Sequence, residues 1–106
     1  MDTMLIYNYL VNIEHGGIIR MPIISRFYGI EISMYYDDHN PPHFHAKYGE
    51  YKILVDIKRA RVIEGFMPSS QTKLVLAWAI IRKDELIKDW ELAKMMEQLE
   101  KIEPLR

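Results

Sequence analysis

Residues 43–58 read HFHAKYGEYKILVDIK, and this stretch predicts a β-hairpin. Its side chains alternate between two faces over residues 43–48, residues 49–50 form a short connection, and the alternation resumes over residues 51–57. Because successive side chains of a strand point to opposite faces, the first strand has an apolar and a polar face. The apolar face, which we expect to meet the core, comprises Phe44, Ala46 and Tyr48, and the polar face comprises His43, His45 and Lys47.

Further strands are predicted on both sides of this hairpin. Residues 30–36 alternate in the same way, and residues 37–42 carry the turn sequence DDHNPP before the hairpin begins. Residues 61–64 are expected to form a fourth short strand. Polar side chains of the neighbouring strands are expected on the same face as the histidines, namely Tyr35, Ser33, Glu31, Lys52 and Asp56.

A helical region follows the strands, with Ser69 and Ser70 as candidate N-caps. An apolar stripe then recurs at helical spacing, but its step of five residues after Ile81 predicts a break near residues 83–85. The stripe comprises Leu74, Ala77, Trp78, Ile81, Leu86, Trp90 and Ala93. Strands followed by helices indicate an α+β fold: a small antiparallel sheet of three to four strands, with one face covered by a C-terminal helix or a broken helix pair.

Composition limits the class of protein. The chain has 106 residues, of which 49% are hydrophobic and 27% are charged, so it suits one globular domain. It has no cysteine, which excludes disulfides, thiolate zinc sites, iron–sulfur clusters and cysteine nucleophiles. The formal charge of −1 gives no overall basic field for nucleic acid. The longest apolar run, Leu74 to Ile81, is far shorter than the ~20 residues of a membrane span, and we expect a cytoplasmic protein.

Residues 1–20 differ in character from the rest of the chain. They do not fit a signal peptide, because Asp2 replaces the basic start and Asn8 interrupts the apolar stretch. We expect an N-terminal extension that is not part of the native domain, with translation starting at Met21 and a single domain over residues 21–106. The codons of Gly16-Gly17 can supply a purine-rich ribosome-binding site just upstream of that methionine. The intact mass of natively expressed protein tests this expectation.

Three of the four histidines fall within seven residues, at His39, His43 and His45. Two imidazoles on one strand face can bind a divalent metal ion, with His39 or Asp38 completing the ligand set. The same imidazoles can act as general acid and base in metal-free RNA cleavage, with Lys47 holding a phosphate. Two simpler interpretations stay open. The histidines bind an anion or a partner without any reaction, or their ring nitrogens cap carbonyl groups of the double-proline loop.

Two segments carry a further signal, MPIISRFYGI at residues 21–30 and DHNPPHFHA at residues 38–46. They resemble the domain-of-unknown-function 4160 family of small bacterial proteins, and the likeness extends over residues 21–105. The resemblance implies a small cytoplasmic protein that usually begins at the position of Met21. It also implies a protein partner of the domain-of-unknown-function 2442 family, in a pair proposed as a toxin–antitoxin module. The family assigns no catalytic residue.

The leading prediction is therefore a component of a toxin–antitoxin-like pair that acts on RNA through its histidines. The predicted catalytic residues are His43, His45 and His39, and the predicted substrate-binding residues are Lys47, Arg26 and Tyr35. The alternatives are a non-enzymatic protein-binding module and a small metal-binding domain. In the last case a divalent metal ion is the cofactor, and the ligands come from His43, His45, His39 and Asp38.

Overall fold

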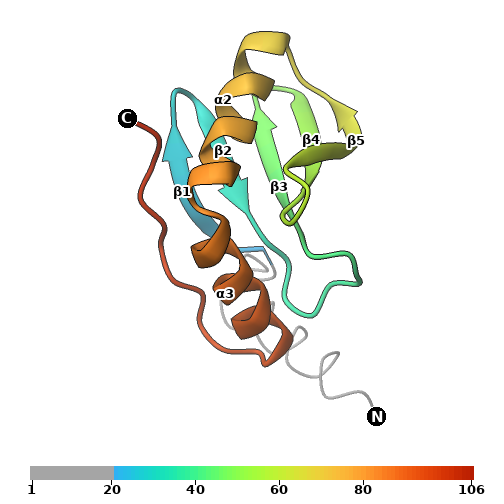
Figure 1. Ribbon diagram of the computed structural model, residues 1–106, viewed down its shortest axis with the longest axis vertical. Helices are drawn as coiled ribbons and strands as arrows, with labels where there is room; N and C mark the ends of the chain where they lie inside the picture. Colours follow the sequence, from blue (N-terminus) through green and yellow to red (C-terminus); the bar gives the residue numbers. More distant parts are fainter. Residues whose placement is uncertain (1–20) are drawn as a thin grey trace.

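The computed structural model describes residues 21–106, so the predicted extension over residues 1–20 lies outside the described residues. The described chain forms one antiparallel sheet whose strands are neighbours in sequence order, followed by two helices (Figure 1). The strands are β1 (Ile23–Phe27), β2 (Ile30–Ser33), β3 (His43–Tyr48), β4 (Tyr51–Asp56) and β5 (Arg61–Phe66), and the helices are α2 (Ser69–Ile81) and α3 (Lys83–Lys94). The predicted α+β class is confirmed, and so is the hairpin of β3 and β4.

The predicted strand count of three to four is corrected to five, because β1 is a strand that the sequence pattern did not reveal. The pairing of β1 with β2 is irregular between Ile23 and Ser25. Such a bulge interrupts the alternation of side chains, so both Ile24 and Ser25 are buried. A strand with a bulge does not show the two-residue period that sequence analysis searches for.

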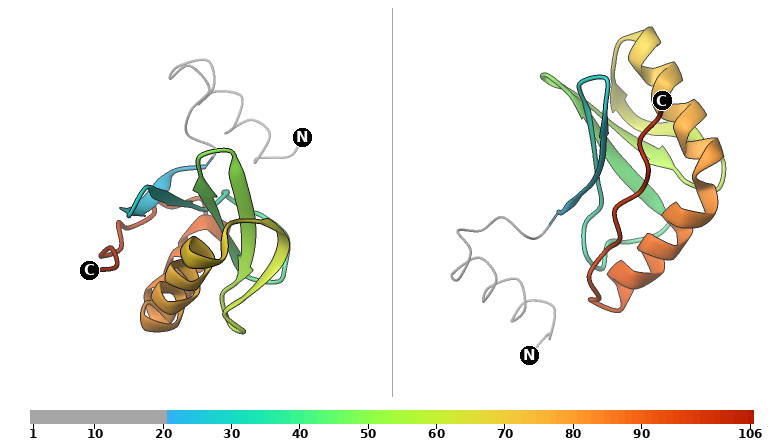
Figure 2. Two further views of the ribbon diagram at one scale, coloured as in Figure 1. Left: turned by 90° about the horizontal axis from the view of Figure 1, so that it is seen from above. Right: turned by 90° about the vertical axis from the view of Figure 1, so that its left-hand side faces the viewer.

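The helices cover one face of the sheet only (Figure 2). Apolar side chains of the strands meet those of the helices in this layer, and Phe44 packs its ring edge-on against Trp78 of α2. On the opposite face, no helix or strand of residues 21–106 covers the sheet. Lys47 and Lys52 of the hairpin are exposed there, whereas His43, which was expected on the same polar face, is buried.

The break between the two helices is confirmed at Arg82, but the predicted buried face of α2 is partly wrong. Ile81 is 62% exposed, whereas Val75, Trp78 and Ala79 are the buried residues of α2. The reason is that residues 74–81 of α2 are all apolar, so periodicity does not single out one side. In α3 the predicted residues Leu86, Trp90 and Ala93 are buried, and Asp89 is buried as well.

The last twelve residues pack along the sheet instead of forming a free tail. Figures 1 and 2 show this segment running beside β1 from the end of α3 to the C-terminus. The backbone N–H of Ile102 donates to the carbonyl of Ile24 at 2.8 Å, and the Trp78 indole N–H donates to the carbonyl of Glu103 at 2.8 Å. Within residues 21–106, neither helix is long and apolar enough to cross a membrane.

Candidate functional site

A carboxylate lies at the centre of the histidine cluster. Asp38 Oδ2 is 3.0 Å from His43 Nε2 and 3.8 Å from His45 Nε2. Asp38 Oδ1 is 3.9 Å from His39 Nε2, although the His39 side chain is 84% exposed. Asp38 and His39 belong to the loop between β2 and β3, and His43 and His45 belong to the start of β3. The structure thus brings His43 and His45 together with Asp38, while His39 lies at the solvent-exposed margin of the cluster.

Contacts with α3 hold the loop that carries Asp38. Lys94 donates from Nζ to the Asp38 carbonyl at 3.0 Å and pairs with the Asp37 carboxylate at 3.3 Å. The backbone N–H of Asp37 donates to the carbonyl of Ala93 at 3.1 Å. The side chain of Asp38 is itself oriented, because Oδ1 accepts a hydrogen bond from the His39 backbone N–H at 2.8 Å. Its other oxygen, Oδ2, is left to face the histidines.

His43 is buried and bonded at both ring nitrogens. Its Nδ1 lies 2.7 Å from the carbonyl oxygen of Pro41. A carbonyl only accepts, so Nδ1 carries a proton and donates it. The other ring nitrogen, Nε2, lies at hydrogen-bond distance, 3.0 Å, from Asp38 Oδ2. The ring also packs against Trp90 of α3, with centroids 5.3 Å apart. The His43 side chain is therefore enclosed by Pro41, Asp38 and Trp90, and it is buried.

His45 is the histidine that opens toward the uncovered face. Its Nε2 is buried, and no hydrogen-bond partner for it exists among the described residues. Burial lowers the pKa of His45 below its usual value, and the neighbouring His43 lowers it further, against a smaller opposing effect of Asp38. The neutral imidazole is thereby favoured, and this is the form that binds metal ions. Tyr35 packs its ring edge-on against His45 at 4.8 Å between centroids.

A cavity of about 360 Å³ lies beside His45 on the uncovered face. Its lining residues are Met21, Ile23, Glu31, Ser33, Tyr35, His45, Ala46, Lys47 and Lys52. The register places Ser33 beside His45 and Lys47 beside Lys52, as expected. His43 and its register partner Asp56 were expected on the same accessible face, but both are buried. Arg26 is the one predicted substrate-binding residue that does not line this cavity. Its Nε lies 3.4 Å from a carboxylate oxygen of Glu31.

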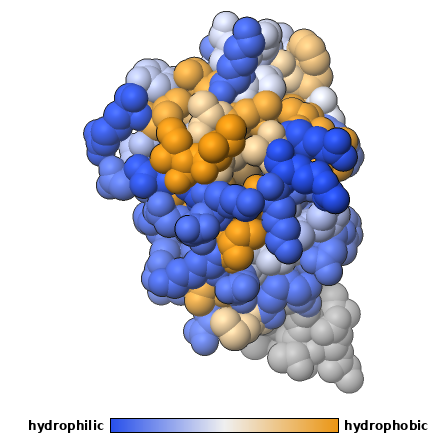
Figure 3. Space-filling view, in the orientation of Figure 1, coloured by the Kyte–Doolittle hydropathy of each residue, from blue (hydrophilic) through white to orange (hydrophobic). Residues whose placement is uncertain are grey.

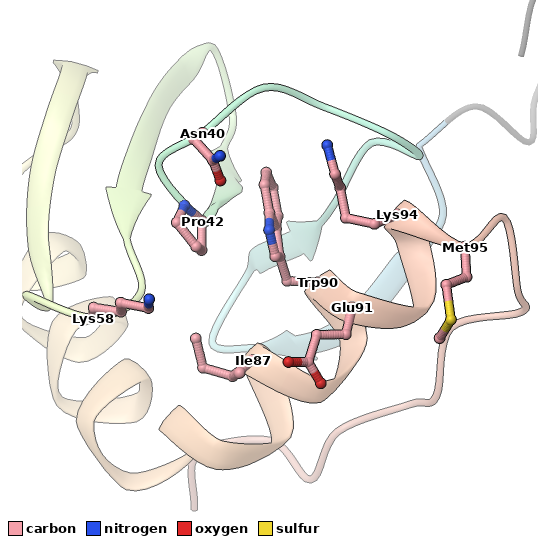
Figure 4. Close-up of a pocket in the computed structure, with 8 residues that line it drawn as sticks. All are labelled: Asn40, Pro42, Lys58, Ile87, Trp90, Glu91, Lys94 and Met95. Atoms are coloured by element: carbon pink, nitrogen blue, oxygen red, sulfur yellow. The ribbon is translucent and has the colours of Figure 1, made fainter.

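A second hollow, of about 630 Å³, lies on the helical side of the histidine loop. Figure 4 shows Trp90 rising from α3 toward Asn40 and Pro42, with Lys58 at the opposite margin. The ammonium group of Lys94 is 5.9 Å from the centroid of the Trp90 ring. The two cavities share no lining residue.

Sequence reasoning did not find the part that α3 has in this site. Trp90 and Lys94 are about fifty residues from the histidines, and no local pattern links them. Helical spacing gives Trp90 a buried position, which is confirmed, but it does not identify the neighbour against which the ring packs. A hydrogen bond from a histidine to a carbonyl of the double-proline loop is one of the predicted interpretations, but the sequence does not identify Pro41 as the acceptor.

Comparison with known proteins gives a family without a function. No curated protein and no solved structure matches the chain. The family model described as a domain of unknown function, DUF4160, matches residues 29–91. That segment runs from β2 into α3 and contains Asp38 and the three clustered histidines. Since the match covers more than half of the sequence, the chain belongs to the DUF4160 family.

Proposed function

We propose that this domain binds a divalent transition-metal ion through Asp38, His43 and His45. The observation that carries the proposal is the convergence of one donor atom from each residue, all within 4.8 Å of one another. Two imidazoles and one carboxylate are a ligand set that zinc and iron(II) sites use. His39 stands at the margin of this group, because its side chain points into solvent.

The distances between the donor atoms support this proposal. Ligand atoms about 2.1 Å from a tetrahedral zinc ion lie about 3.4 Å from one another. The two distances from Asp38 Oδ2, 3.0 Å to His43 Nε2 and 3.8 Å to His45 Nε2, lie on either side of that value. The donor atoms all lie within 4.8 Å of one another, so rotation of the side chains has to bring any longer pair nearer to 3.4 Å when an ion binds.

Contacts outside the donor set support it as well. A histidine that binds a metal commonly donates its other ring N–H to a backbone carbonyl, which fixes the ring. His43 does so toward Pro41, and its remaining nitrogen is the one that faces Asp38. Three protein ligands leave a coordination position for water or a substrate, which is the pattern of catalytic metal sites.

Calorimetric titration with Zn²⁺ tests the proposal, on untagged protein first treated with a chelator. We expect binding of one ion per chain, and a loss of affinity of at least tenfold in Asp38→Asn and in His45→Ala. Glu31→Gln is the matched control, since it removes a carboxylate from the same face outside the donor set, and its affinity should equal that of the unmodified protein. Absence of binding, or equal affinity in all four proteins, would reject the metal site.

The predicted acid–base chemistry on RNA remains a separate prediction. It requires both His43 and His45 to reach the substrate, but the two side chains are not equally accessible. His43 is 2% exposed and bonded at both nitrogens, while His45 borders the open cavity. Arrest of bacterial growth on expression of the chain, followed by its loss in His45→Ala, would support a toxin that depends on this face.

We also propose that the chain pairs with a protein of the domain-of-unknown-function 2442 family, the partner that the family resemblance implies. Support comes from an apolar patch over α2 on the surface that faces the viewer in Figure 3. Ile80 and Ile81 of α2 are 65% and 62% exposed. Apolar side chains that lie together on a surface are typical of protein–protein interaction sites.

Co-expression of the two proteins and capture of the complex tests the pairing. We expect Ile80→Glu and Ile81→Glu to abolish co-purification while each variant keeps its circular dichroism spectrum. Phe66→Glu is the matched control, because Phe66 is 68% exposed but belongs to β5, and it should leave the complex intact. Co-purification that survives both α2 variants would exclude this patch as the contact surface.

A further inference from the structure

Two lysines face each other on the central strands of the uncovered face. Lys47 of β3 and Lys52 of β4 are register partners, and both are exposed. Like charges directly opposite each other destabilise an antiparallel pair. Within residues 21–106 neither ammonium group forms an ion pair with a carboxylate. The juxtaposition of the two ammonium groups therefore costs stability in the described part of the fold.

The lysine pair borders the cavity that His45 opens into. Glu31 lines the same cavity and is the register partner of Lys47, but its carboxylate is engaged by Arg26 at 3.4 Å. Taken with Arg26, this row of four side chains carries two positive charges in excess. A cavity with unpaired cations and a hydroxyl donor, Ser33, is suited to an anion.

We propose that Lys47 and Lys52 bind the phosphate groups of single-stranded RNA along this face. An aromatic ring beside a basic groove is the arrangement that holds unpaired bases, and Tyr35, 40% exposed, lines the cavity next to His45. The proposal names a substrate class for the candidate metal site. The proposal rests on the metal site only in naming RNA as the substrate of that site. Binding of phosphate groups by the lysines does not itself require the metal.

The salt dependence of binding distinguishes this role from that of ordinary surface lysines. Each phosphate contact with a single strand contributes about −0.7 to the slope of the logarithm of the association constant against the logarithm of salt concentration. A lysine that contacts a phosphate changes both affinity and slope when it is neutralised. A lysine elsewhere on the surface changes neither by a comparable amount.

The experiment measures binding of a short fluorescent single-stranded RNA by anisotropy, at several salt concentrations, with and without chelator. We expect Lys47→Gln and Lys52→Gln each to weaken binding at least threefold, and the double variant to make the slope shallower by about 1.4. Lys73→Gln, on the exposed side of α2, is the matched control and should leave affinity and slope unchanged. Thermal melting of each variant checks that the fold is intact.

The outcomes separate this proposal from the metal site. RNA binding that depends on the lysines in chelated protein supports it even where zinc titration shows no binding. A double variant that binds RNA as tightly as the unmodified protein, or loses no more than the Lys73 control, overturns it. That result leaves the metal titration of Asp38→Asn and His45→Ala unaffected, so the two failures are distinguishable. Equal binding of duplex and single-stranded RNA would also overturn it, because stacking on Tyr35 needs unpaired bases.

Discussion

His39 and His43 both approach Asp38, but their surroundings give them different weight in the fold. His43 is buried, is bonded at both ring nitrogens and packs on Trp90. His39 is exposed, and its ring has a 3.9 Å contact with the carboxylate and lies 5.8 Å from the His43 ring between centroids. A side chain whose removal leaves a buried gap and an unpaired carbonyl costs more stability than one in solvent.

We expect His43→Ala to lower the free energy of unfolding by about 3 kcal/mol, because it removes packing and two hydrogen bonds. His39→Ala should change it by no more than about 0.5 kcal/mol. Urea denaturation followed by tryptophan fluorescence measures both values, and since Trp90 adjoins His43 the signal reports the site directly. Equal losses in the two variants would contradict the environments described for these histidines.

Asp89 is an acid on α3 that the fold buries completely. Its Oδ1 accepts a hydrogen bond from the Glu100 backbone N–H at 2.8 Å, while its Oδ2 is buried without a partner among the described residues. Burial raises the pKa of Asp89 to about 6, from 3.8. Between these two values the folded chain binds more protons at this position than the unfolded chain does.

The stability that protonated Asp89 contributes is therefore complete below about pH 3.8 and is lost as pH rises through about 6. We expect this loss to reach up to about 3 kcal/mol in the unmodified protein. Asp89→Asn should not show it, so the difference in unfolding free energy between the two proteins should change over this pH interval. Denaturant titrations at a series of pH values measure the difference, and a constant difference would contradict the raised pKa.

At the scale of elements, β5 depends on a glycine at its contact with β4. Gly65 has a φ of +91° and pairs with Ile53. A Cβ at this position would collide with the backbone carbonyl oxygen of Lys52, which belongs to the neighbouring strand and has no freedom to rotate away. Gly49 in the hairpin connection also has a positive φ, of +58°, but a Cβ there would meet nothing within 4 Å.

Gly65→Ala should consequently destabilise the fold by at least about 3 kcal/mol, since it combines backbone strain with a backbone clash. Gly49→Ala should cost only about 1 kcal/mol, the price of a left-handed conformation alone. Thermal unfolding of the two variants gives the comparison. If the two melting temperatures fell by the same amount, the close approach of β5 to β4 at Gly65 would be wrong.

At the scale of the whole molecule, the C-terminal segment joins the two layers. It bonds to β1 through Ile102 and to α2 through the Trp78 indole, and it supplies the backbone N–H that Asp89 accepts. Ile102 is 4% exposed and belongs to the main core, so the segment contributes apolar burial as well as hydrogen bonds. Its removal would expose the edge of β1 and the polar atoms that it pairs.

We expect Ile102→Ala to reduce the free energy of unfolding by about 2 to 4 kcal/mol, the usual range for a buried large-to-small change. Met95→Ala is the control at the start of the same segment, because Met95 is 63% exposed, and it should change stability by no more than about 0.5 kcal/mol. Hydrogen exchange at the amide of residue 102 adds a local readout. Rapid exchange of this amide in the unmodified protein would contradict the packing of the segment.

Local sequence patterns are sufficient to predict several elements of this fold. Alternation revealed the β3–β4 hairpin and the polar face of His45 and Lys47, and the shifted stripe revealed the break between α2 and α3, because side-chain direction along a strand or helix depends only on position in that element. The sequence also identifies the histidine segment, because the donor residues Asp38, His43 and His45 lie within eight positions of one another. Such features need no knowledge of the rest of the fold.

The burial of one histidine and the support of the site depend on contacts between distant parts of the chain. The burial of His43 depends on Trp90, and the position of Asp38 depends on Lys94, which lies fifty-six residues further along the chain. The strand β1 also depends on its neighbours, because a bulge removes the alternation and leaves pairing with β2 to define it. Contacts between distant segments arise from packing of the whole chain, so no local pattern records them.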